Sequence, residues 1–405
     1  MNMSNEVRAN GGSAETTLSA SAETASNDAF SFWKVPEEWR DALAPTIAES
    51  RSAAEHFLLE QYLDDRYRRP PSAIRTYYRL KHFIPDRVRF RLNSMAVRTR
   101  HRRSFPAWPC ESALMDLWRE WLQQALHQVG AEDGWHIGFW PAGHRCCVVL
   151  THDVESTRGL ELIDAVADLE EKYGFYSAWN LPLNQYPIDW QRVARLRARG
   201  FEFGAHGLRH DGRLFRSRED FAELAPRLEQ LARDHDLVGF RAPSTLRRAE
   251  WIAAMSFDFD SSFSDTDPWE PQPGGTCSLF PFYLGQLIEL PYTLPQDHTL
   301  IHLLHRDPVQ LWTSKAHWVA SVGGMVLTLT HPDYMRSGGL AEYEELLRCL
   351  SAIENSWRAL PSEVAAWWRR RSELRLYLKQ GTPRIEGPSP HAAVVVRLSD
   401  EPLAS

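Results

Sequence analysis

From residue 145 onward the chain alternates between short apolar runs and longer segments of helical periodicity. Strands that alternate with helices form parallel sheets, because each helix carries the chain back to the start of the next strand. Seven runs within about 190 residues favour a closed barrel over an open sheet. The runs are CCVVLTHDVE (146–155), FYSAWNLPL (175–183), FEFGAHG (201–207), LVGFRAPS (237–244), FDFDSSFS (257–264), LIELPYTLP (287–295) and MVLTLTHPDY (325–334). We therefore expect an α/β fold built as a seven-stranded β/α barrel.

The chain before residue 141 follows a different pattern. Residues 29–140 read mostly as helix, since apolar residues recur there every three or four positions. The first 28 residues are rich in Ser, Ala, Thr, Asn and Glu, which predicts a disordered tail. We therefore divide the chain into four parts: a disordered tail (1–28), a helical N-terminal extension (29–140), a barrel (141–375) and a C-terminal tail (376–405).

A strongly basic segment lies inside the helical extension. Residues 66–103 contain 13 Arg or Lys and one acid, Asp86, a balance of +12 within a chain of net charge -7. Such a segment suggests an acidic partner, for example an anionic glycan, a membrane surface or a nucleic acid. Docking on the chain's own acidic barrel is an equal alternative. The segment predicts no specific nucleic-acid recognition.

The distribution of apolar residues and the number of cysteines indicate where in the cell the protein is expected. No stretch approaches the roughly 20 apolar residues of a membrane-spanning helix, and the first residues contain no apolar block typical of a signal peptide. The five cysteines are an odd number and match neither a disulfide framework nor a zinc finger. We expect a cytoplasmic protein, with peripheral attachment to a membrane as an option.

Two pairs of histidines lie four residues apart, His206 with His210 and His298 with His302. This spacing is one helical turn, and among 16 histidines it arises by chance, so the surroundings must decide. His298 and His302 are flanked by Leu and Ile in HTLIHLLH, which is typical of a helix whose histidines have local partners. His206 and His210 follow an apolar run directly. We expect the first pair to bind metal.

Reactive side chains follow four of the apolar runs, and in a β/α barrel the carboxyl ends of strands form one rim. Two imidazoles and a carboxylate are a usual ligand set for a catalytic divalent metal, with a position left for water. Asp153 and Glu155 are two residues apart, so in an extended strand both face one site, one as ligand and the other as base. The side chains expected at this rim are Asp153, Glu155, His206, His210, Arg241 and His331.

The motifs LTHDVE, HGLRH, FRAPS and LTLTH occur along the chain in that order. Their order and spacing resemble those of the polysaccharide deacetylase family, metal-dependent carbohydrate esterases with a distorted seven-stranded β/α barrel. The resemblance covers about residues 145–370. It implies no function for the helical extension before the barrel.

The resemblance implies a role for individual residues. Asp153 corresponds to the catalytic base, and His206 and His210 correspond to the two histidine ligands of the metal. Arg241 corresponds to the arginine that orients the base. His331 corresponds to the general acid.

Three further positions follow from the same resemblance. Pro243 stands in its expected place within the arginine motif, and Leu329 corresponds to a wall of the pocket for the acetyl methyl group. Ser244 occupies a position where many members have a tyrosine whose backbone N–H helps to bind the oxyanion. The backbone donor survives that change of residue.

The carboxylate motif departs from the family pattern. Many members have the metal aspartate directly after the base, and others have Asp-x-Asp. This chain has Asp-Val-Glu, so Glu155 must take the ligand role with a side chain one methylene longer. A carboxylate remains available to a divalent metal, with zinc the expected ion.

Together these features predict a metal-dependent hydrolase that removes N- or O-acetyl groups from a sugar or polysaccharide. A metal-activated water, an Asp base and a His acid would carry the reaction. Two alternatives stay open. The same barrel could act as an amidohydrolase on a small non-sugar amide, or it could be a catalytically inactive glycan-binding protein.

Overall fold

The structure is a computed structural model that describes residues 26–64, 104–335 and 338–403. Nearly all of the expected N-terminal tail, 1–28, and the whole basic segment, 66–103, lie outside the described residues. The predictions made for these two segments therefore remain predictions.

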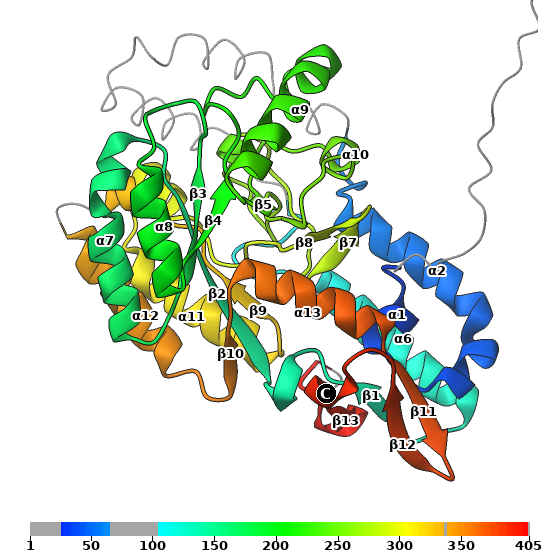
Figure 1. The fold of residues 1–405 in the computed structure, drawn as a ribbon. Helices are drawn as coiled ribbons and strands as arrows, with labels where there is room; N and C mark the ends of the chain where they lie inside the picture. The colour runs from blue at the N-terminus through cyan, green and yellow to red at the C-terminus, as the bar shows by residue number, and fades with distance from the viewer. Residues whose placement is uncertain (1–25, 65–103, 336–337, 404–405) are drawn as a thin grey trace, which may run out of the picture.

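A curled, mainly parallel β-sheet forms the centre of the molecule (Figure 1). Each of the seven apolar runs supplies one of its strands, and an eighth parallel strand, β10, pairs with the start of β2. Strand β7 joins β8 in antiparallel orientation. The strands are β2 (Cys146–Asp153), β3 (Ser177–Leu181), β4 (Glu202–Ala205), β5 (Gly239–Phe240), β6 (Phe259–Asp260), β7 (Phe282–Leu284), β8 (Leu287–Glu289), β9 (Met325–Leu327) and β10 (Ser356–Arg358). The expected α/β class is confirmed, with one more parallel strand than the seven predicted.

The curl of the sheet brings its last strands back to the first. The backbone N–H groups of Thr293 and Leu294, just beyond β8, donate to the carbonyl oxygen of Leu327 in β9, both at 3.1 Å. Strand β9 in turn pairs with β2. Because these strands run parallel, their carboxyl ends gather at one rim, where the functional groups of a β/α fold converge.

Helices connect the strands and cover the outside of the sheet (Figure 1). Their starts have polar caps, as expected for helix N-termini: Ser156 caps α7, Asp189 caps α8 and Ser217 caps α9. The helices of this part are α7 (Thr157–Lys172), α8 (Trp190–Arg199), α9 (Arg218–Asp234), α10 (Ala249–Ile252), α11 (Pro308–Ser321), α12 (Gly339–Ser351) and α13 (Pro361–Glu373). Within the described ranges, none of the helices combines the length and apolar character needed to cross a membrane.

Three N-terminal helices, α1 (Ala29–Trp33), α2 (Arg40–Leu58) and α6 (Ala113–Val129), share the hydrophobic core of the sheet. The ring of Phe32 in α1 stacks on Trp118 of α6 with centroids 4.9 Å apart. The same ring meets the edge of Phe280, a residue just before β7, at 5.3 Å. One apolar cluster therefore joins the N-terminal helices to the sheet.

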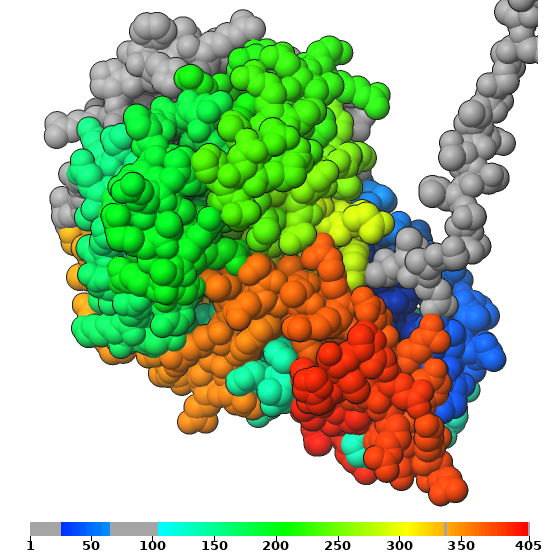
Figure 2. All heavy atoms as spheres, in the orientation of Figure 1, coloured from blue at the N-terminus to red at the C-terminus, as the bar shows by residue number. Residues whose placement is uncertain are grey.

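The last part of the chain, residues 376–405, was predicted as a C-terminal tail but contains further strands. Strands β11 (Arg375–Lys379) and β12 (Thr382–Glu386) form a hairpin, and β13 (Val395–Arg397) pairs with β1 (Trp135–Ile137). Leu398 and Leu403 are buried beyond them. In the space-filling view this red segment lies against the blue N-terminal helices (Figure 2). These strands are only three to five residues long, which is too short for apolar periodicity to distinguish them from loops.

Candidate metal centre and catalytic groups

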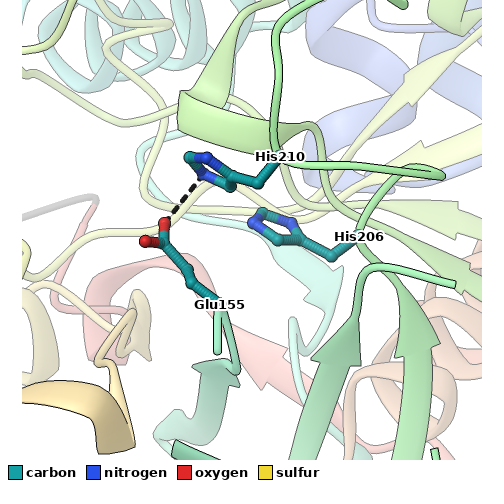
Figure 3. Close-up of side chains that lie close together, drawn as sticks. All are labelled: Glu155, His206 and His210. Carbon is teal, nitrogen blue, oxygen red and sulfur yellow. Dashed lines mark ion pairs between the residues drawn. The ribbon is translucent and has the colours of Figure 1, made fainter. Parts of the chain in front are cut away.

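Glu155, His206 and His210 bring three potential ligand atoms within 4.8 Å of one another. Glu155 lies two residues beyond β2, and the histidines lie in the loop that follows β4. Figure 3 shows the three side chains pointing toward a common point. Their spacing of four does not arise from a helix here: Gly207, between them, has a φ of +73°, and a Cβ there would lie 2.8 Å from Cγ of Pro243. A tight loop therefore aims both rings at Glu155.

His206 has the hydrogen bonding of a metal ligand. Its Nδ1 atom lies 3.0 Å from the carbonyl oxygen of Arg241, which can only accept, so Nδ1 carries the proton and Nε2 keeps its lone pair. Nε2 is buried and has no hydrogen-bond partner among the described residues. Burial lowers the pKa of His206 to about 4, although Asp153 opposes this. A buried, neutral imidazole with its lone pair directed at a carboxylate and a second imidazole fits a divalent metal.

His210 and Glu155 are held together by a third side chain. His210 Nε2 lies 2.7 Å from Oε1 of Glu155. Gln185 accepts a hydrogen bond from the backbone N–H of His210 at 2.6 Å and donates one to the carbonyl of Glu155 at 2.5 Å. Loss of contact with water raises the pKa of Glu155, but His210 outweighs this and holds the pKa well below its usual value. The carboxylate is therefore ionised and available as a ligand.

Asp153 lies beside this group but is bound differently. The register of β2 and β3 places it opposite Asn180, whose side-chain amide donates to Oδ1 at 2.9 Å. Arg241 Nη1 lies 3.6 Å from Oδ1, and His206 Nε2 lies 3.8 Å from Oδ2. Burial raises the pKa of Asp153, but His206 and Arg241 outweigh it and keep the pKa below its usual value. The geometry provides an ionised carboxylate beside the three ligands.

His331, four residues beyond β9, faces the same group. Its Nε2 lies 3.8 Å from Oε1 of Glu155, and its Nδ1 lies 2.6 Å from Oδ1 of Asp297. Burial lowers the pKa of His331, yet Asp297 and the more distant Glu155 outweigh it and raise the pKa to about 10. The ring is therefore protonated at neutral pH and able to donate.

The remaining expected residues lie around this centre. Ser244 belongs to a 3₁₀ turn, Pro243–Thr245, and its Oγ is 3.4 Å from His210 Nε2. Pro243 is buried in the same turn, against Gly207. Leu329 is fully buried in the core, two residues before His331. Ser244 is thus joined to the metal ligands by a direct contact.

The second histidine pair borders the site without joining the ligand group, since the ring of Tyr334 lies 5.1 Å from that of His331 and 6.0 Å from that of His298. His298 and His302 belong to a short π-helix, His298–Leu303, with ring centroids 6.0 Å apart. His302 meets the ring of Tyr334 edge-on at 4.5 Å. Neither histidine belongs to the metal-ligand group found among the described residues.

Four site residues were not predicted from the sequence: Asn180, Gln185, Asp297 and Asp333. Asp333 accepts from the backbone N–H of Glu155 at 3.0 Å and also bonds the Ser156 hydroxyl. Asn180 was visible as a polar residue within an apolar run, and Asp333 follows His331 by two positions. Asp297 stands directly before His298, 34 residues from His331, and nothing in the sequence indicates their pairing. No sequence pattern marks Gln185 as a site residue.

No protein-family model matches the chain, and no curated protein matches it. A candidate polysaccharide deacetylase from Mycobacterium smegmatis is similar in structure, with a TM-score of 0.46, 20% identity and coverage of 57% of this chain and 92% of that one. An allantoinase, Puue, has a TM-score of 0.46 at 12% identity over the same shares of the two chains. A candidate polysaccharide deacetylase from Pseudomonas aeruginosa has a TM-score of 0.45 at 13% identity, over 56% of this chain and 92% of its own. These distant likenesses leave the function to be decided by the site itself.

Proposed function

We propose that the protein is a metal-dependent hydrolase that removes acetyl groups from an N- or O-acetylated sugar or polysaccharide. One observation carries the proposal: Glu155, His206 and His210 converge within 4.8 Å, and a carboxylate–arginine pair and a protonated histidine lie beside them. A ligand set, a base and an acid at one centre are the parts that hydrolysis of an amide or ester requires. The choice of a sugar as substrate rests on the sequence motifs that resemble those of polysaccharide deacetylases.

The ligand set suits a divalent metal, and we propose zinc. Two imidazoles and one carboxylate leave a coordination position for water, which is typical of catalytic sites. The buried lone pair of His206 Nε2 supports this assignment, because an imidazole without a hydrogen-bond partner is costly unless it binds something. When bound, such an ion supplies Lewis acidity, polarising the substrate carbonyl and lowering the pKa of the attacking water.

Asp153 is the proposed base. Its carboxylate takes the proton of the attacking water, while the side chains of Asn180 and Arg241 hold its position. Arg241 is itself fixed, since one of its nitrogens donates to Ser261 Oγ at 2.7 Å. Because Asp153 is ionised over the neutral range, it is ready to accept this proton.

His331 is the proposed acid. It gives its Nε2 proton to the leaving amine or alcohol as the carbon–nitrogen or carbon–oxygen bond breaks. Asp297 accepts from both Nδ1 and the backbone N–H of His331, so the ring keeps one orientation and the positive charge is stabilised. The base and the acid each lie 3.8 Å from one of the ligands, Asp153 from His206 and His331 from Glu155.

The backbone N–H of Ser244 is the proposed oxyanion donor, and Leu329 with Pro243 is proposed to line the acetyl-methyl pocket. A backbone donor stabilises the charge that develops on the carbonyl oxygen. The contact between Ser244 Oγ and His210 Nε2 supports this role, because it keeps residue 244 beside the ligands.

Metal analysis and acetate release test the proposal together. Purified protein should contain close to one divalent ion per chain and release acetate from N-acetylglucosamine oligomers. Release only from small non-sugar amides would favour the amidohydrolase alternative. Bound metal and bound glycan without acetate release would favour an inactive binding protein. Absence of metal after loading with zinc would refute the assignment of the ligand group.

A further inference from the structure

The loop that carries Ser244 has an unusual backbone. Ser244 and Thr245 are consecutive non-glycine residues with positive φ, +54° and +48°. Residues other than glycine reach this conformation only at a cost in free energy, so surrounding contacts must maintain it. The groups that hold this loop are therefore part of what fixes the site.

Arg247, which belongs to the same loop, stabilises this backbone conformation through hydrogen bonds. Its side chain is almost wholly buried, and Nη1 donates to the carbonyl oxygens of Thr245 at 3.2 Å and of Gln272 at 3.0 Å. The amide of Gln272 completes the arrangement, accepting from the backbone N–H of Arg247 and donating to its carbonyl. Arg247 thus fixes the residue next to Ser244.

The partner of Arg247 comes from the N-terminal part of the chain. Glu60, two residues beyond α2, accepts from Nε of Arg247 at 2.9 Å and from Nη2 through its other oxygen. Both side chains are buried, at 5% exposure or less. Such a two-bonded carboxylate fixes the plane of the guanidinium group, which leaves Nη1 aimed at Thr245.

The chain around Glu60 is anchored to the same region. The hydroxyl of Tyr62 donates to the carbonyl of Gly275 at 2.5 Å. A Cβ at Gly274 would collide with Oε1 of Glu60 and would lie 2.9 Å from Cδ1 of Leu63. Residues 60–63 therefore fit closely against the turn at 274–275, so Glu60 has little freedom to move away from Arg247.

We infer that Glu60 is a positioning residue for the proposed hydrolysis. Acting through Arg247, it holds the positive-φ turn that presents Ser244 beside His210. The inference rests on the proposed function. It assigns a role in that function to the N-terminal part of the chain, because residue 60 lies outside the strand-end motifs that supply the other groups. Loss of the carboxylate charge would leave Arg247 buried without its counter-ion and would loosen the turn.

The test compares Glu60→Gln with Glu401→Gln in the full chain loaded with zinc. Glu401 is also a buried carboxylate, 3.1 Å from the buried ring of His136, but it lies beside the β1–β13 pair. Glu60→Gln should lower kcat on a small acetylated substrate on the order of 10- to 100-fold, with KM and metal content nearly unchanged. Glu401→Gln should reduce thermal stability but leave kcat unchanged. Arg247→Lys, which keeps the charge but loses the fork of donors, should resemble Glu60→Gln.

Hydrogen exchange supplies a readout that needs no turnover. Backbone amides of residues 243–248 should exchange faster in Glu60→Gln than in the wild type and remain protected in Glu401→Gln. Unchanged kcat and unchanged exchange in Glu60→Gln would overturn the inference while leaving the proposed function standing. Equal losses of kcat in Glu60→Gln and Glu401→Gln would show that Glu60 contributes only to the stability of the fold, which would also overturn the inference. A wild-type protein that releases no acetate, whatever its exchange pattern, would instead refute the proposed function and the inference with it.

Discussion

Asp297 accepts two hydrogen bonds from His331, one from the ring Nδ1 at 2.6 Å and one from the backbone N–H at 2.7 Å. This contact is the main reason that the pKa of His331 stands at about 10 despite burial. Because the folded-state pKa lies above the ordinary value of about 6.5, the contact stabilises the fold fully below that value. The stabilisation is lost as the pH rises through 10.

The first prediction follows from this pair. Asp297→Asn keeps the shape of the side chain but removes its charge, so the pKa of His331 should fall. The basic limb of kcat/KM against pH should then move to lower pH by about 1–3 units. The measurement is a pH–rate profile of both proteins on one substrate. A basic limb that stays in place would mean that another group supplies the proton.

The second prediction separates Asp153 from Glu155. Asp153→Asn should keep its metal but lose roughly 10²–10⁴-fold in rate, because an amide cannot accept the proton of water. Glu155→Gln should lose metal first and activity as a consequence, with partial recovery in excess metal. Metal content measured beside acetate release distinguishes the two. If Asp153→Asn empties the site and Glu155→Gln stays metallated, the two roles are exchanged.

The third prediction uses the two histidine pairs as matched controls. His206→Ala and His210→Ala should each abolish bound metal, because each removes one of three ligands. His298→Ala should leave the metal in place, since its ring lies outside the ligand group. Equal loss of metal in all three variants would contradict the choice of pair.

The fourth prediction concerns the close fit at Gly274. Gly274→Ala forces a methyl group against Glu60 and Leu63 and should destabilise the fold by about 1–3 kcal/mol beyond the cost of its backbone conformation. Gly130→Ala is the control: φ there is +66° and nothing lies within 4 Å of the added Cβ. The control should cost only about 1–2 kcal/mol. Denaturant unfolding of both variants measures the two costs, which also differ in their backbone part because φ is +152° at Gly274.

The fifth prediction addresses the basic segment 66–103, which lies outside the described residues. Reversing the charge at Arg98, Arg100, Arg102 and Arg103 should weaken binding to an anionic glycan, lipid or nucleic acid, most clearly at low salt. Turnover of a small soluble substrate should remain nearly unchanged. Collapse of that rate would place the segment against the barrel as a structural element.

Local pattern predicted the strands and the residues at their ends, but not the partners of those residues. An apolar run marks a strand such as β2, and parallel pairing then brings Asp153 and His206 to one rim. Asp297 and Asn180 could not be paired with His331 and Asp153 in the same way, because side-chain partners depend on register and on the course of loops. Strand β10 was not predicted because it has only three residues, two half-buried and one exposed, which give no periodic signal.

The Glu60–Arg247 contact could not be predicted from the sequence for a related reason. Its two residues are 187 positions apart, and neither carries a motif. A buried ion pair of this kind is specified by the folded surroundings of both groups, including the absence of a side chain at Gly274. Sequence periodicity describes one element at a time and contains no information on contacts between residues far apart in the chain.

The packing of the first helix bears on how the chain folds during synthesis. The carbonyl oxygen of Phe32 accepts a hydrogen bond at 2.9 Å from Arg371, 339 residues later, and Lys34 donates to the carbonyl of Ser372. At about 5–20 residues per second, roughly 20–70 s separate the translation of these partners. The aromatic face of α1 lacks Phe280 for most of that interval and Arg371 for all of it. The N-terminal helices are made first but complete their packing among the last, so this interval is when the nascent chain most needs protection from aggregation.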